Sequence, residues 1–111
     1  MLTQSDYIFL TKLNISLNNI LVFAAVMNSG GLLPASYYMN CSQAAISVSL
    51  KKFCTCFPSK LFNRDGRRLI PTPEAIALYE SMIPVILSFR EVLEYDIDNL
   101  GNTEKNIATS N

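Results

Sequence analysis

The sequence contains no histidine and only three cysteines, and both shortages limit the chemistry that it can support. Cys54 and Cys56 are two residues apart, which in a helix places them about 200° apart, so their thiols cannot share a metal ion. With no histidine and no second cysteine pair, neither a zinc site nor any other cofactor is expected. We interpret these two residues and Cys41 as small buried or half-buried hydrophobic residues, with a reactive thiol as the alternative.

Other absences narrow the class of protein. No nucleophile lies beside a recognisable base, and no glycine-rich loop could hold a phosphate, which argues against an enzyme. The amino terminus lacks the basic start and long apolar core of a signal peptide, and no run approaches the roughly 20 apolar residues of a membrane span. We therefore expect a non-enzymatic protein in the cytoplasm, without a membrane partner.

Charge is balanced overall but unevenly placed. Nine Lys and Arg residues match nine Asp and Glu residues, yet residues 1–72 hold seven of the bases and two of the acids. Seven minus two gives this part a charge of +5, and two minus seven gives residues 73–111 a charge of −5. A basic module followed by an acidic tail suits nucleic-acid binding, although the acids also suit a solvated helix. At 111 residues, half of them apolar, the chain can bury one modest core.

Helical patterns follow a less regular beginning. Residues 1–16 show no long periodicity and are expected to form a loosely docked N-terminal arm. Ser16 can cap a helix over residues 17–29, and Gly30-Gly31 can end it. A shorter helix is expected over residues 33–39, with Pro34 in its first turn. The core-facing positions of the first helix would be Leu17, Ile20, Leu21, Ala24 and Met27.

A third helix is expected after the Asn40-Cys41 turn, with Ser42 as its cap. Glutamine can read adenine, serine can act as donor or acceptor, and lysine suits a phosphate or a guanine edge. Any solvated helix surface could show the same residue types, so this pattern alone does not separate DNA reading from simple exposure. The polar side near the helix start presents Gln43, Ser47 and Lys51, and the core side presents Ile46, Leu50, Phe53 and Phe57.

Three arginines within five residues follow this helix. Pro58 should end the helix, residues 60–63 and 67–70 can form two short strands, and residues 64–66 can form the turn, since Asp-Gly is a strong hairpin signal. A two-stranded hairpin is too small to be stable alone and must lean on the helices. Arg64, Arg67 and Arg68 would then lie beside the third helix, where they could contact phosphates or the minor groove. A solvated turn is the alternative, but such turns seldom concentrate so many arginines.

The last region begins with Thr72-Pro73-Glu74, which combines a capping hydroxyl, a proline at the first helical position and an acid in the first turn. A heptad seam follows and predicts a dimerisation helix over residues 73–100, with one long helix packed on its own domain as the alternative. Pro84 should kink or break this helix, and residues 101–111 should form a disordered tail. The seam consists of Ile76, Tyr79, Ile83, Ile86, Arg90, Leu93, Ile97 and Leu100.

Taken together, residues 17 to about 95 resemble the winged helix-turn-helix domain and linker helix of LysR-type transcriptional regulators. The family's Ser-Gln-Pro-Ala-Val-Ser stands here as residues 42–47 (SQAAIS), its Leu-Phe-x-Arg-x-x-Arg as residues 61–67 (LFNRDGR), and its Leu-Thr-Pro as residues 71–73 (PTP). The spacing between these motifs matches without a gap. The phrase IPTP, with Phe57-Pro58 where many members have Leu-Gly, most resembles the branch of nodulation-gene activators.

The resemblance implies a mainly α, winged helix-turn-helix protein that binds double-stranded DNA as a homodimer, with the third helices in successive major grooves and the wings on the flanking backbone. Two departures from the family matter. Val48 and Ser49 stand where many members have Arg and Gln, so base contacts are expected to be fewer or differently placed, and Ala44 replaces a proline. The implied DNA-binding residues are Ser42, Gln43, Ala44, Ser47, Lys51, Lys52, Arg64, Arg67 and Arg68; the implied dimerisation residues are Ile76, Tyr79, Ile83, Ile86, Leu93 and Ile97.

Length is a further departure. Family members normally continue into a ligand-sensing α/β domain of roughly two hundred residues. We expect this chain to be either a fragment or a naturally short protein, without an inducer site and with no small-molecule ligand. The predicted function is that of a sequence-specific, nucleoid-associated transcription regulator. The alternative is an interaction module that pairs through residues 73–100 with a full-length regulator; Val48 and Ser49 slightly favour it, and the three arginines oppose it.

Overall fold

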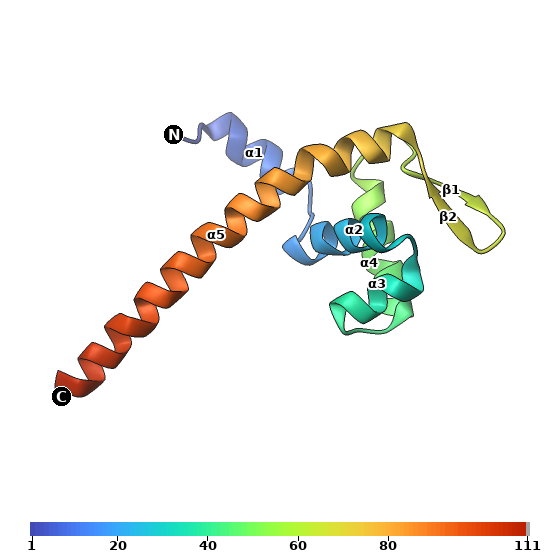
Figure 1. Cartoon of the computed structure of the whole chain (residues 1–111). Coiled ribbons are helices and arrows are strands. Elements are labelled where there is room, and N and C mark those ends of the chain that lie inside the picture. Colours follow the sequence, from blue (N-terminus) through green and yellow to red (C-terminus); the bar gives the residue numbers. More distant parts are fainter. Residues whose placement is uncertain (111) are drawn as a thin grey trace. The chain divides into compact units, whose positions relative to one another are not determined.

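The computed structural model describes the backbone of residues 1–110 and the side chains of residues 1–95. The elements are α1 (Gln4–Lys12), α2 (Leu17–Ser29), α3 (Leu32–Met39), α4 (Gln43–Thr55), β1 (Phe62–Asp65), β2 (Arg68–Pro71) and α5 (Pro73–Ser110). The chain divides into two compact units, Met1–Tyr79 and Glu80–Asn111, and α5 begins in the first. Within the first unit, α2, α3 and α4 pack together and the β1–β2 hairpin projects from them (Figure 1). This is the predicted fold class, a winged helix-turn-helix followed by a long helix.

Side-chain caps define where α2 begins and ends. Ser16 Oγ accepts a hydrogen bond from the Asn19 backbone N–H at 3.1 Å, and Asn19 Oδ1 accepts one from the Ser16 N–H at 3.0 Å. This reciprocal capping box satisfies two donors that the first turn of a helix leaves unpaired. Gly30 ends the helix with a φ of 90°, a left-handed conformation that glycine adopts without steric cost. The helix therefore spans the predicted residues 17–29.

The corner between α3 and α4 is built in a similar way. Asn40 has a φ of 52°, and the Cys41 N–H donates to the Ser36 carbonyl at 3.1 Å, which is the Schellman arrangement that closes a helix end. Ser42 Oγ then accepts from the Ala45 N–H at 3.1 Å and caps α4, as predicted. The last predicted core residue of this helix, Phe57, lies just beyond it, because α4 ends at Thr55.

Aromatic rings form the centre of the core. Phe23 of α2 is fully buried and stacks on Phe53 of α4, with ring centroids 4.4 Å apart. Its ring also meets the edges of Phe62, at 6.1 Å, and Tyr79, at 6.4 Å. Edge and offset contacts of this kind add stability beyond the area that they bury. One residue of α2 thus joins α4, the hairpin and the first turns of α5.

The predicted core face of α2 is wrong. Leu17, placed in the core by its spacing, is 46% exposed, whereas Phe23 is 0% exposed. This helix is apolar around most of its circumference, so two different stripes both have helical spacing. Packing against α3 and α4 selects the stripe that carries the phenylalanine. The buried residues of α2 are Asn19, Val22, Phe23 and Val26.

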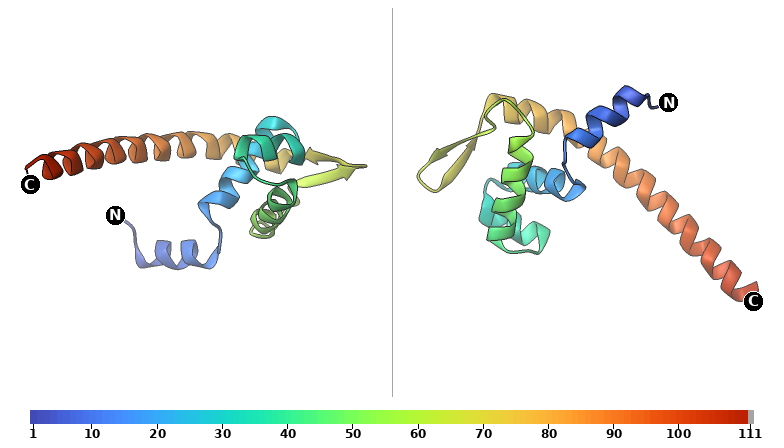
Figure 2. Two further views of the ribbon diagram at one scale, coloured as in Figure 1. Left: turned by 90° about the horizontal axis from the view of Figure 1, so that it is seen from below. Right: turned by 180° about the vertical axis from the view of Figure 1, so that it is seen from behind.

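The hairpin is present, but its turn lies later than predicted. The antiparallel register pairs Asp65 with Arg68, which leaves Gly66 and Arg67 as a two-residue loop. Gly66 has a φ of 63° and Arg67 does not have a positive φ, which is the pattern of a type II′ turn. Such a loop matches the twist of the strands. In this register Arg67 belongs to the loop and Arg64 to β1. Both views in Figure 2 show the hairpin projecting from the helices.

Thr72 connects the hairpin to α5. Its hydroxyl donates to the Lys60 carbonyl at 2.7 Å and accepts from the Ala75 N–H at 3.2 Å. The side chain therefore caps α5 and holds the base of the hairpin at the same time, and it is 7% exposed. The predicted helix start at residues 72–74 is confirmed.

Two expectations about α5 can be compared with the structure. The predicted break at Pro84 does not occur, because a proline removes only one hydrogen bond, that to the Glu80 carbonyl, and the turns on either side continue; the alternative of a kink at Pro84 stays a prediction. The backbone is also helical from Gly101 to Ser110, where we predicted a disordered tail. Extending an existing helix costs much less than starting one, which favours this continuation. Asn111 lies outside the described residues.

Residues 1–16 contain a helix that periodicity did not indicate. Thr3 and Asp6 form a capping box, in which Asp6 Oδ2 accepts from the Thr3 N–H at 2.8 Å. Hydrogen bonding to the Thr3 backbone, and secondarily to the Thr3 side chain, holds the pKa of the Asp6 carboxyl below its usual value. Every residue of α1 is exposed, so local capping rather than a hydrophobic face defines this helix. Among the described helices, none by itself has the length and apolar character to cross a membrane; only α1 and α2 taken as a pair, bent by 64°, pass that test.

Candidate nucleic-acid interface

The exposed side of α4 carries the residues that the sequence predicted to contact DNA. Ile46, Leu50 and Phe53 face the core, at 6% exposure or less. A helix turns about 100° per residue, so positions outside that stripe point away from the domain. The predicted residues of this helix and its cap are all exposed: Ser42, Gln43, Ala44, Ser47, Lys51 and Lys52.

A groove of about 410 Å³ lies between α4 and the hairpin. Ser47 and Lys51 line it from the helix, and Arg64 lines it from β1. Its apolar floor includes Leu50 and Phe62, which are both tied to the core. The structure therefore brings together one hydroxyl and two cations from segments far apart in the sequence. No acidic residue lines this groove.

The three hairpin arginines do not share one face. Cross-strand partners lie on the same face of a sheet, so Arg64 lies with its partner Leu69 on the groove side. Arg68 pairs with Asp65, which neighbours Arg64 in the strand, and therefore lies on the opposite face. Arg67 occupies the exposed loop. The expectation that all three lie beside the reading helix is thus wrong for Arg68.

Cations of the interface are free of ion pairs. In the part of the chain whose side chains are described, the ion pair found is Arg90–Glu94 on α5, with 3.8 Å between nitrogen and oxygen. Lys51 and the hairpin arginines therefore keep their charges available for an anionic partner. Lys52 lies apart from them and lines two other depressions, of about 440 and 410 Å³, together with Asn14.

Sequence reasoning missed the roles of Val48 and Ser49. Ser49 is 7% exposed, and its Oγ accepts from Asn19 Nδ2 at 2.7 Å, so it belongs to the packing between α2 and α4. The signal was available, since Ser49 lies three residues after Ile46 and so falls on the core stripe. Val48 is 60% exposed, although it is one of the most apolar residues of the helix.

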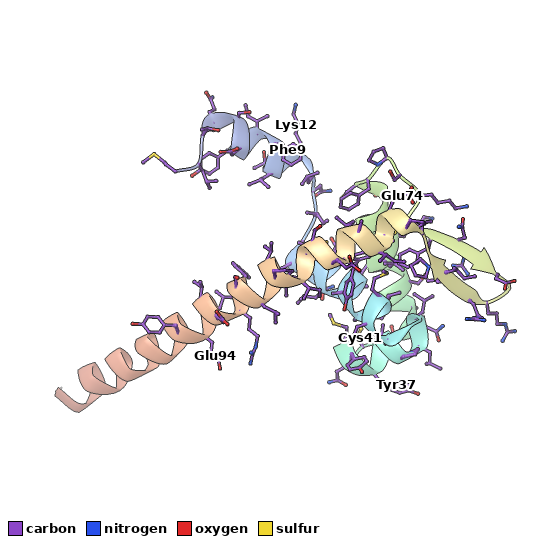
Figure 3. The ribbon with its side chains drawn as sticks, turned by 45° about the horizontal axis from the view of Figure 1, so that its top comes forward. Phe9, Lys12, Tyr37, Cys41, Glu74 and Glu94 are labelled. Atoms are coloured by element: carbon purple, nitrogen blue, oxygen red, sulfur yellow. The ribbon has the colours of Figure 1, made fainter. Side chains whose placement is uncertain are left out.

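Two exposed tyrosines were also missed. Tyr37 and Tyr38 of α3 are 77% and 67% exposed. Figure 3 shows Tyr37 and Cys41 together at the corner that leads from α3 into α4. Their residue type carried no signal, because aromatic residues within a short helix are usually read as core residues.

The proposed dimerisation residues have different environments. Tyr79 is half-buried and contacts Phe23, so its ring is committed to the first unit. Ile76 and Leu93 are 44% and 40% exposed. Ile97 lies outside the residues whose side chains are described, and Ile83 and Ile86 are half-buried. Exposed apolar residues outside the predicted seam widen the apolar surface of α5: Val85, Leu87, Phe89 and Val92.

Comparisons with known proteins agree with this architecture. Residues 17–76 match the family model of bacterial regulatory helix-turn-helix proteins of the LysR family. The chain is 40% identical over 73 residues to YbeF, an uncharacterized HTH-type transcriptional regulator of Escherichia coli, covering 66% of this chain and 23% of the relative. It is 32% identical over 92 residues to nodulation protein D 2 of Sinorhizobium fredii, covering 82% of this chain and 30% of the relative. The chain thus spans less than a third of these relatives.

Solved structures show the same fold. A probable transcriptional regulator from Pseudomonas aeruginosa superimposes with a TM-score of 0.65 at 28% identity, covering 73% of this chain and 27% of that one. The full-length virulence activator AphB of Vibrio cholerae gives a TM-score of 0.64 at 20% identity, covering 73% and 28%. The motifs, the hairpin register and the match over most of the winged domain agree, and the chain belongs to the LysR family of bacterial regulatory helix-turn-helix proteins.

Proposed function

We propose that this chain is the DNA-binding part of a dimeric transcription regulator. The observation that carries the proposal is the groove between α4 and the hairpin, where Ser47, Lys51 and Arg64 converge with no acidic residue in the lining. Cations without ion-pair partners beside an exposed helix suit the phosphates that flank a DNA groove. Family membership supports a regulatory rather than an enzymatic role, and with it a place in the cytoplasm at the nucleoid.

In this proposal α4 enters the major groove through its exposed side. Gln43 and Ser47 read base edges, each contributing on the order of 1 to 3 kcal/mol of discrimination if the contact is well formed. Lys51 and Arg64 hold phosphates at the groove edge, and Arg67 and Arg68 extend the positive charge along the hairpin. Ser42, Ala44 and Lys52 complete the surface that approaches DNA.

Dimerisation through α5 is the second part of the proposal. Its exposed apolar residues would be covered by the same helix of a partner, as a heptad pattern requires. Leu93→Glu places a charge in this seam and should convert a dimer to a monomer in analytical ultracentrifugation. A dimer that survives this change, and the matched change Ile76→Glu, would refute the seam.

The test of DNA binding is fluorescence anisotropy with a labelled, mixed-sequence duplex across a salt titration. Wild type should lose affinity steeply between about 50 and 200 mM salt, and a variant with Arg64, Arg67 and Arg68 replaced by alanine should lose most of that binding. Lys12→Ala removes one exposed cation from α1 and is the control. Equal binding by the triple variant and wild type would contradict the role of the hairpin.

An interaction module without DNA binding is the second candidate. It is favoured by Val48, an exposed apolar residue on the helix that would otherwise read bases. A folded dimer that binds no duplex at low salt, yet forms mixed dimers with a full-length LysR-family regulator, would place this candidate first.

A further inference from the structure

Val48 lies on the side of α4 that points directly away from the core. Residues 46, 50 and 53 form the buried stripe of this helix. Residues 44, 48, 51 and 55 repeat with the same spacing but are shifted by two residues, which turns them about 200° away from the core. All four are exposed. The surface that extends farthest from the domain on this helix therefore consists of Ala44, Val48, Lys51 and Thr55.

The middle of this surface cannot form hydrogen bonds. Val48 is 60% exposed and has no polar side-chain atom. The neighbouring Ser49 is turned inward, where its hydroxyl accepts a hydrogen bond from Asn19 Nδ2. Ala44, one turn earlier and also exposed, is equally apolar. A base edge that meets this part of the helix finds only methyl groups.

Base pairs differ in how they tolerate such a contact. A donor or acceptor buried against valine loses its bond to water without replacement, which costs free energy. The thymine C5-methyl group is the one apolar feature that an unmodified base presents in the major groove, and apolar side chains contact it favourably. An apolar centre on α4 therefore selects thymine and disfavours cytosine or guanine at the same position.

We infer that Val48 is a specificity-determining residue that recognises a thymine methyl group in the major groove. The inference rests on the proposed function and adds the chemistry that one position of the site selects. Lys51 on the same side of α4 and Arg64 across the groove favour duplex DNA as the occupant over an apolar protein surface, because both bring positive charge to the rim. Removing one methyl from the DNA should weaken binding about three- to fourfold, the value expected for one buried carbon.

The experiment has two stages. Wild type is first used to select binding sequences from a random duplex library, and each thymine of a selected duplex is then replaced in turn by uracil, which lacks only the methyl group. At least one replacement should weaken wild-type binding about three- to fourfold, while Val48→Ala should bind the thymine and uracil duplexes equally. Ile8→Ala, a truncation at an exposed apolar residue of α1 outside the proposed DNA and dimer surfaces, should keep the thymine preference.

The outcomes separate the two proposals. One outcome is that the selected DNA binds while every thymine-to-uracil replacement weakens wild type no more than it weakens the Val48→Ala variant. In that case the Val48 inference is overturned and the proposed function stands. If the library binds but selection enriches no particular sequence, the protein does not discriminate between DNA sequences. This result would overturn the proposed base contacts, including that of Val48. If wild type binds no duplex, the proposed function and the inference are refuted together.

Discussion

Arg64 and Arg68 carry the same charge on the same hairpin but lie on opposite faces, and DNA binding should distinguish them. Arg64 lines the groove with Lys51, whereas Arg68 lies opposite Asp65 in the strand register and on the other face of the hairpin. Each phosphate contact contributes about 0.9 to the slope of log affinity against log salt. A dimer carries two copies, so Arg64→Ala should lower the slope by about 2. The ratio of wild-type to variant affinity would then rise about tenfold as salt falls from about 200 to 50 mM.

Arg68→Ala is the matched control, because it removes the same charge from a residue that is also exposed. It should change the slope by less than half as much as Arg64→Ala. Anisotropy titrations of both single variants on one mixed-sequence duplex measure the difference, and circular dichroism checks that both remain folded. Equal slopes for the two variants would show that hairpin charge alone matters, and would refute the argument from strand faces.

Four further predictions concern the domain itself. Ser49→Ala leaves Asn19 Nδ2 without its 2.7 Å acceptor and should cost about 1 to 3 kcal/mol in urea unfolding; a loss below about 0.5 kcal/mol would contradict a structural role. Gly30→Ala meets no atom within 4 Å but imposes a side chain at a φ of 90°, so unfolding should become easier by about 1 to 2 kcal/mol, and a much larger loss would reveal a clash instead. Burial, with the neighbouring Cys56, raises the pKa of the Cys54 thiol above 9.0, so iodoacetamide should label Cys54 more slowly than exposed Cys41 at pH 8, as mass spectrometry can show. Because folded Cys54 keeps its proton at a pH where the unfolded thiol loses it, this residue should also lower stability as the pH rises past 9.0.

Element boundaries could be predicted from the sequence because caps act over very short distances. Ser16, Ser42 and Thr72 each accept a bond from a backbone N–H three residues later, and Gly30 ends α2 through its own φ. Such interactions depend on neighbours in the chain and little on tertiary packing. The arrangement of three motifs at family spacing was likewise legible in the sequence. The sequence did not indicate α1, since its capping box preceded no apolar periodicity, and it misplaced the limits of the two strands and the end of α5.

The choice of faces was decided by tertiary structure. Spacing alone allowed two core stripes on α2, and the stacking of Phe23 on Phe53 selected one of them. The loop at residues 66–67 set a register in which Arg64 faces the groove and Arg68 does not.

In a strand, neighbouring side chains lie on opposite faces, so a small error in the predicted turn was enough to hide the placement of Arg64 and Arg68 on different faces of the hairpin. Ser49 was likewise polar by sequence but became a core residue once Asn19 of α2 lay across from it. The sequence by itself determined the types, order and limits of most elements, because those depend on contacts a few residues apart. Packing between distant segments decided which side chains reach solvent, and therefore which residues are available for the proposed contact with DNA.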